Sequence, residues 1–134
     1  MSAGYSGTPL VRKLGIADGQ RVLLAGAPAG WELPAPVPDV TVHRRATADP
    51  YDVVLAFCPD AAALRARFAP LAERLTTAGA LWIAWPKRAS GVATDLDENA
   101  VRAHGLGCGL VDVKVCAVDE TWSGLKFVRR LRDR

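Results

Sequence analysis

The chain has 134 residues, half of them hydrophobic and 23% charged, and a net charge of +3 at pH 7. This is the composition of one globular domain with its own core, and no apolar run is long enough to span a bilayer. The three cysteines form no C-x-x-C pair, so neither a disulfide framework nor a zinc site is indicated. The first residues show no basic region followed by an apolar one, the pattern of a signal peptide. We therefore expect a cytoplasmic protein without a metal.

The first predicted elements are a short helix and a buried strand. Thr8 is expected to cap the helix, Pro9 to take its first position and Gly15 to end it. Residues 21–26 form a continuous apolar run, which is typical of a strand covered on both faces. Three prolines in residues 33–38 then exclude a long helix.

The middle of the chain alternates between strands and a helix. Residues 40–45 alternate in polarity and favour a half-exposed edge strand, and residues 51–57 favour a second buried strand. The helix opens at residues 59–60, Pro70 predicts a kink inside it, and Gly79 is expected to end it. Its apolar face has members four, three and four residues apart: Leu64, Phe68, Leu71 and Leu75.

The last third predicts a strand, a helix and a hairpin. Residues 81–85 favour a third buried strand, and Asp95 is expected to cap a helix with Glu98 at its third position. Residues 110–118 and 126–130 are predicted to pair as a hairpin. Three glycines are expected to end the helix: Gly105, Gly107 and Gly109.

This order of elements predicts an α/β fold. We expect a small Rossmann-like, mostly parallel sheet with helices on both faces and a C-terminal antiparallel hairpin. Only residues 46–50 join strand 40–45 to strand 51–57, whereas a parallel crossover normally takes a dozen residues or more. Either the chain crosses in an extended form or strand 40–45 runs antiparallel.

The stretches LGIADGQRVLL (14–24), YDVVL (51–55) and GALWI (79–83) resemble class I methyltransferases. That resemblance implies the same fold and an S-adenosylmethionine site after the first strand, where Gly26 and Gly30 match the family's glycines. However, Pro28 stands at the middle glycine and has no N–H to donate. Arginines at 44 and 45 replace the carboxylate that binds the ribose. These departures disfavour S-adenosylmethionine as the cofactor without excluding it.

A second resemblance runs nearly from end to end. It is carried by YSGTPL (5–10), WPK (85–87), SGVATDL (90–96) and VDVKVCAVDETWSGL (111–125), which are similar to the bacterial domain-of-unknown-function family 3052. It implies the same Rossmann-like fold and a single domain over residues 1–134. In that domain, residues 1–20 hold an N-terminal arm and the short helix, and residues 126–134 hold the last strand and a basic tail. The resemblance implies no activity.

The loop after strand 81–85 is the main candidate site. In open α/β sheets ligands bind beyond the carboxyl ends of the strands. This loop offers two cations, a hydroxyl and amides freed by glycine, which suit an anion; a solvated loop is the alternative reading. An arm over residues 5–8 is expected to fold across the same edge, unless it is a frayed end. The predicted ligand-binding residues are Tyr5, Ser6, Thr8, Gly26, Gly30, Trp85, Lys87, Arg88, Ser90 and Gly91.

No catalytic set can be assembled from the sequence. His43 is expected on an edge strand and His104 late in a helix, and no Ser-His-Asp, Cys-His or His-rich metal set can be built around them. Cys58 is interpreted as a packed thiol, and Thr94-Asp95 as a helix cap. We therefore expect a non-catalytic module that binds a small anionic or nucleotide-like ligand, or a protein partner, at the carboxyl edge. The alternatives are a small S-adenosylmethionine-dependent methyltransferase with a degenerate cofactor loop, and a nucleic-acid-associated protein that acts through its basic tail.

Overall fold

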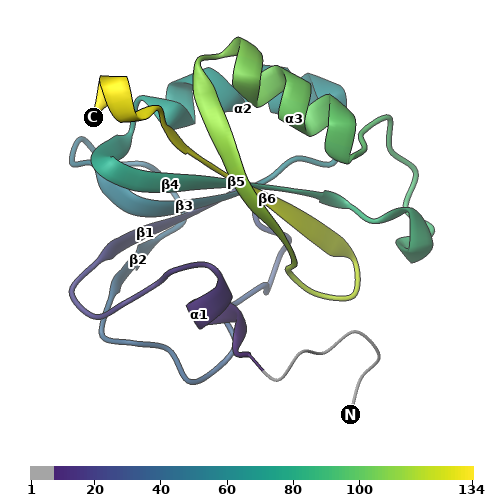
Figure 1. Cartoon of the computed structure of the whole chain (residues 1–134). Coiled ribbons are helices and arrows are strands. Elements are labelled where there is room, and N and C mark those ends of the chain that lie inside the picture. The colour runs from purple at the N-terminus through teal and green to yellow at the C-terminus, as the bar shows by residue number, and fades with distance from the viewer. Residues whose placement is uncertain (1–7) are drawn as a thin grey trace.

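The computed structural model describes residues 8–134, which are built around a six-stranded sheet in the order β2-β1-β3-β4-β6-β5. The strands are β1 (Arg21–Ala25), β2 (Thr41–His43), β3 (Tyr51–Phe57), β4 (Leu75–Pro86), β5 (Leu110–Ala117) and β6 (Trp122–Arg129). The first four run parallel, and β6 is antiparallel to both β4 and β5 (Figure 1). The predicted α/β class with its C-terminal hairpin is confirmed.

The two faces of the sheet are covered differently. Helices α2 (Ala61–Ala72) and α3 (Glu98–Gly107) lie together on one face (Figure 1). The other face carries only the single turn of α1 (Leu10–Lys13) and the loop at 26–40, whose apolar side chains share one core cluster. No helix in residues 8–134 has the length and apolar character needed to cross a bilayer.

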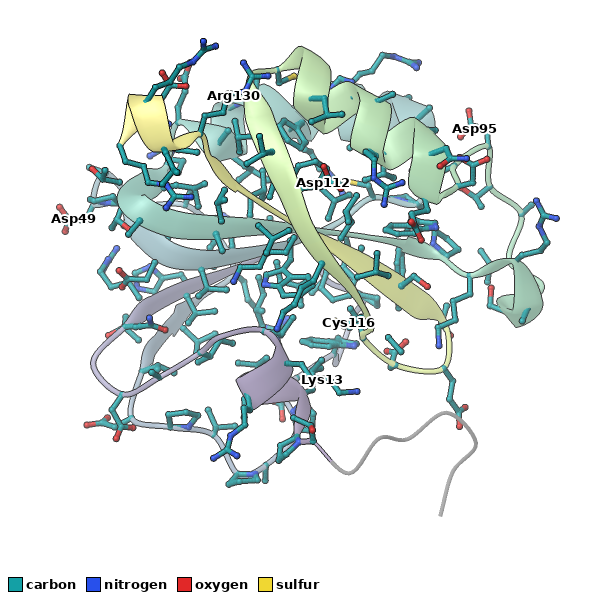
Figure 2. All side chains as sticks on the ribbon, viewed as in Figure 1. Lys13, Asp49, Asp95, Asp112, Cys116 and Arg130 are labelled. Carbon is teal, nitrogen blue, oxygen red and sulfur yellow. The ribbon has the colours of Figure 1, made fainter. Side chains whose placement is uncertain are left out.

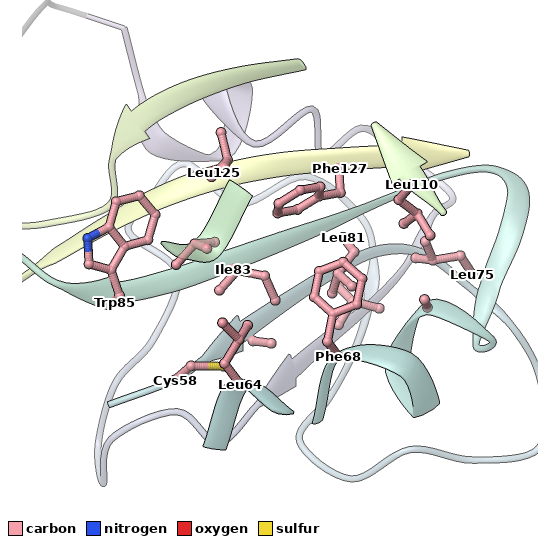
Figure 3. Packing of buried hydrophobic residues seen from close by; sticks show 14 of the residues in the cluster. Cys58, Leu64, Phe68, Leu75, Leu81, Ile83, Trp85, Leu110, Leu125 and Phe127 are labelled. Carbon is pink, nitrogen blue, oxygen red and sulfur yellow. The ribbon is translucent and has the colours of Figure 1, made fainter. Parts of the chain in front are cut away.

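Aromatic side chains fill the core on both faces. On the α1 face, Trp82 is fully buried and its Nε1 donates a hydrogen bond to the Leu14 carbonyl at 3.0 Å. On the helical face, Phe68 from α2 meets Phe127 from β6 edge to face, with ring centroids 5.2 Å apart (Figure 3). The strands predicted as apolar runs are therefore the ones buried on both faces, as continuous hydrophobic strands require.

The ends of α1 and α2 differ from expectation. Pro9, not Thr8, occupies the N-cap of α1, and Pro9 itself makes no side-chain cap hydrogen bond. In α2, Asp60 caps by accepting from the Ala63 amide at 2.8 Å. The helix ends at Ala72 instead of Gly79, because Leu75 already pairs with Tyr51 as the first residue of β4. Pro70 lies inside the last turn of α2, where it has no N–H to donate to the Ala66 carbonyl.

The N-terminus of α3 also corrects the sequence prediction. Its cap is Asp97, whose carboxylate accepts from the Ala100 amide at 2.8 Å. Asp95 instead accepts from the amide of Ala61, the first residue of α2, also at 2.8 Å. A short polar side chain can satisfy any nearby helix N-terminus. The local pattern therefore identified a capping residue but assigned it to the wrong helix.

The short link between β2 and β3 is an extended crossover. β2 is parallel to β1 and has only three residues, so the chain has little distance to return along the sheet. The link wraps around the buried hydroxyl of Tyr51, which lies 2.7 Å from His43 Nδ1 and accepts from the Thr47 amide at 3.1 Å. The antiparallel alternative for this strand is therefore wrong.

Candidate functional site

The carboxyl ends of β1, β3 and β4 form one edge of the sheet. The three strands are parallel neighbours, and the Cys58 amide just beyond β3 donates to Ala84 of β4 at 2.8 Å. Gly26, Cys58 and Lys87, which follow the three strands, therefore lie along the same edge. The strand order reverses between β1 and β3. Open α/β sheets bind ligands just beyond the carboxyl ends of the strands at such a reversal, and we call this position the β1–β3 crevice.

An arginine that the sequence analysis did not single out lies at this crevice. The guanidinium of Arg67, from α2, donates a hydrogen bond to the Phe57 carbonyl. Gly26 makes room for it: its φ is +68°, and a Cβ there would lie 2.5 Å from Arg67 Nη1 and 3.1 Å from the Phe57 oxygen. The glycine thus admits a cation from the opposite helix. No local motif marks Arg67, because it reaches the edge only once α2 packs on the sheet.

Cys58 is a packed thiol at the same edge. Its side chain is fully buried beside Leu64 (Figure 3). Burial raises the pKa of Cys58 to about 11, and the neighbouring Arg67 charge only partly opposes this effect. The neutral thiol is thus the favoured form in the fold. The stability that this preference contributes is lost as the pH rises from 9 towards 11.

The rate of alkylation should distinguish the buried Cys58 from the exposed Cys108. At mildly alkaline pH, iodoacetamide is expected to label exposed Cys108 while Cys58 remains unmodified, because the raised pKa leaves Cys58 with roughly a hundredfold less thiolate than an ordinary cysteine. Peptide mass spectrometry over time measures both sites. Labelling of both in unfolding denaturant is the control, and equal rates in the native protein would contradict this packing.

The loop after β1 is tied down across the edge. Gly30 has a φ of +77° with open space around its Cα, so it serves the turn. The Trp31 indole packs on Phe57 with centroids 5.0 Å apart and donates from Nε1 to Asp119 Oδ2 at 3.0 Å. The Arg44 guanidinium donates to the Trp31 carbonyl. Arg44 therefore holds this loop in place.

A groove of about 510 Å³ lies at the carboxyl end of β4; we call it the β4 groove. It is lined by Trp85, Pro86, Lys87, Arg88, Gly91, Val92, Ala93, Thr94, Asp95, Leu96, Asp97, Glu98 and Ser123. Four predicted ligand-binding residues are among them: Trp85, Lys87, Arg88 and Gly91.

The other predicted residues lie elsewhere. Ser90 turns the loop, since its Oγ donates to the Lys87 carbonyl at 2.6 Å and accepts from the Val92 amide at 3.2 Å. Gly26 and Gly30 belong to the β1 loop, and Thr8 precedes α1; none of the three lines the β4 groove. Tyr5 and Ser6 are outside the described residues.

The acidic side of the β4 groove was not predicted. Asp95, Asp97 and Glu98 line the same groove as Lys87 and Arg88. Figure 2 shows Asp95 at this end of the sheet and Asp49 at the other. From the sequence alone, Asp95 and Glu98 are expected only to cap a helix, although a capping carboxylate has a second oxygen that can contact a ligand.

The remaining polar candidates have structural roles. Asp119 Oδ1 accepts from the amides of Thr121 and Trp122 at 2.8 Å, which closes the β5–β6 turn. In the described part of the chain, no group of three His, Cys, Asp or Glu side chains is placed to hold a metal ion. At the end of β6, where the basic tail begins, Arg129 donates to the carbonyls of Ala72 and Leu75 at 3.0 and 3.1 Å. The basic tail is thus docked at the amino edge, away from the β4 groove.

Comparison with known proteins defines the fold. No protein-family model and no curated protein matches the chain. Magnesium protoporphyrin IX methyltransferase from Synechocystis PCC 6803, solved with bound S-adenosylmethionine, matches 90% of this chain and 74% of its own, with a TM-score of 0.60 and 16% identity. The fold is that of methyltransferases.

Two further solved structures share this methyltransferase-type fold. The N-methyltransferase NodS from Bradyrhizobium japonicum WM9 covers 88% of this chain and 90% of its own, with a TM-score of 0.55 and 15% identity. A ribosomal protein L11 methylase from Lactobacillus delbrueckii subsp. bulgaricus covers 90% and 75%, with a TM-score of 0.54 and 11% identity. Identities this low show the fold alone, and the resemblance to family 3052 gains no support from a family match.

Proposed function

We propose that this chain binds a small ligand at the carboxyl edge of its sheet, and that S-adenosylmethionine, for methyl transfer, is the first candidate. The observation that carries this candidate is the match to an S-adenosylmethionine-bound methyltransferase over 90% of the chain. A fold alone does not define an activity. The residues at the crevice between β1 and β3 must therefore decide whether this ligand fits.

The crevice fits one end of the ligand better than the other. S-adenosylmethionine supplies an activated methyl group and carries a carboxylate, which the Arg67 guanidinium beside Gly26 would bind. The half-buried ring of Trp31 would offer a stacking surface to the adenine. The residue after β2 is Arg44, so the ribose hydroxyls lack a carboxylate partner there. One lost charged hydrogen bond is worth about 1.5–3 kcal/mol, so we expect weaker binding than in an enzyme that keeps the carboxylate.

Titration calorimetry tests this candidate. Wild-type protein is expected to bind S-adenosylmethionine, and Arg67→Met to weaken that binding by about tenfold or more, because a charged hydrogen bond is lost. Arg65→Met is the matched control, since Arg65 is exposed on the same helix and should leave the affinity unchanged. Circular dichroism establishes that each variant is folded. Absence of binding at millimolar ligand rejects the candidate, and equal affinity in Arg67→Met rejects the role of Arg67.

The second candidate is a non-catalytic module that binds an anionic ligand in the β4 groove. It is favoured by Lys87 and Arg88, which line the groove and form no ion pair with any carboxylate of residues 8–134. A nucleic-acid contact through the tail has less support, because backbone carbonyls accept hydrogen bonds from Arg129, Arg130 and Arg134.

A further inference from the structure

We infer that the β4 groove binds a small zwitterion, such as an amino acid or a dipeptide, in preference to a simple anion. This inference deepens the second candidate function and rests on it. It follows from the two kinds of charge that line one groove, with Lys87 and Arg88 as its cationic side chains and Asp95, Asp97 and Glu98 as its acidic ones.

The cationic part of the groove is the loop that follows β4, and hydrogen bonds fix the backbone of this loop. The Lys87 amide donates to the Thr121 carbonyl at 2.8 Å, and the Ser90 amide donates back to the Lys87 carbonyl at 3.1 Å. These bonds fix the backbone from which the Lys87 and Arg88 side chains extend. Neither side chain has a carboxylate partner among the described residues, so both charges are available to a carboxylate or a phosphate.

The carboxylates of the groove are positioned by hydrogen bonds to the N-termini of α2 and α3. Asp95 uses Oδ1 to accept from the Ala61 amide, and Asp97 uses Oδ1 to accept from the Ala100 amide, each at 2.8 Å. Each carboxylate keeps Oδ2 for another partner. Glu98 adds a third negative charge, although Arg102 pairs with it at 2.6 Å. This side of the groove is suited to an ammonium group.

A ligand with both charges satisfies both sides. A simple anion bound to Lys87 and Arg88 would be repelled by the carboxylates that line the same groove. The ammonium group of a zwitterion would instead be attracted to those carboxylates. The apolar part of the groove, from Trp85, Pro86 and Leu96, can cover a carbon chain between the two charged ends. The volume of about 510 Å³ suits a small molecule.

Matched probes separate the two charges. We would titrate the protein by calorimetry with L-leucine and glycyl-leucine, then with N-acetyl-glycyl-leucine, glycyl-leucine amide and inorganic phosphate. At least one zwitterion is expected to bind. Removing either charge of glycyl-leucine should weaken its binding about tenfold, because one charged contact is lost. If neither zwitterion binds at millimolar concentration, or if the acetylated or amidated dipeptide binds as well as the parent, the inference is wrong.

Substitutions test which groove residues bind each charged end of the zwitterion. Arg88→Gln is expected to weaken the binding of the zwitterion. Asp95→Asn should also weaken it, although this variant keeps a side-chain oxygen that can accept from the Ala61 amide. Asp95→Asn should also strengthen phosphate binding, because it removes a repelling charge. Asp49→Asn, at the opposite end of the sheet, should change nothing (Figure 2).

The outcomes distinguish the inference from the function on which it rests. If phosphate binds as tightly as the zwitterions and only Arg88→Gln weakens it, the anion-binding function stands and the inference falls. If neither phosphate nor a zwitterion binds, both fall.

Discussion

Replacing Trp82 with alanine is expected to lower the free energy of unfolding by about 3–5 kcal/mol. Trp82 is fully buried in the middle of β4, level with Leu55 and Lys126 on the neighbouring strands. The alanine would leave a cavity, and the Leu14 carbonyl would lose its hydrogen-bond donor. Urea unfolding followed by circular dichroism measures the change without relying on tryptophan fluorescence.

Two controls separate the cavity from the hydrogen bond. Trp82→Phe retains most of the ring volume and should cost about 1–3 kcal/mol, mainly from the unpaired Leu14 carbonyl. Val113→Ala on β5, where the side chain is 51% exposed, should cost less than about 0.5 kcal/mol. A Trp82→Ala protein as stable as the Val113→Ala protein would show that the N-terminal segment does not dock on β4 as described.

Replacing Gly105 with alanine should lower the free energy of unfolding by about 1–3 kcal/mol. Gly105 is buried in α3, and a Cβ there would overlap the ring of Phe127, itself fully buried on β6. The ring has little room to move, because Phe68 packs against it edge to face. Thermal and urea unfolding of the variant measure the loss.

The matched control lies two residues along the same helix. Gly107 is exposed with no atom within 4 Å of a new Cβ, so Gly107→Ala should be neutral or stabilise the protein by up to about 1 kcal/mol through helix propensity. Equal effects of the two alanines would mean that α3 does not approach β6 closely at Gly105.

In this chain β1 is connected to β2 by the loop at residues 26–40 and not by a helix. Its prolines exclude a long helix, and the Trp31 ring packs on Phe57, which in turn packs edge to face on Trp122 with centroids 5.1 Å apart. The aromatic contacts replace the apolar face that a helix would bury on this side of the sheet. A ligand at the β1–β3 crevice must therefore fit beside Arg67 and this loop.

The amino-acid sequence by itself determined the sheet strands and the edge at which ligands are expected. Continuous apolar runs marked β1 and β3 because strands covered on both faces have no polar side to alternate with. The loop with Lys87 and Arg88 was predictable for the same reason, since it follows such a run.

The partners of the side chains were decided only by the tertiary structure. Asp95 reads as a cap of the helix that follows it, yet it bonds Ala61, 34 residues away, and Trp31 bonds Asp119, 88 residues away. Nor does any local pattern show that Arg67 reaches Gly26 or that carboxylates line one groove with Lys87. Periodicity and capping preferences act over one or two helical turns, whereas these contacts depend on how separate elements pack against each other.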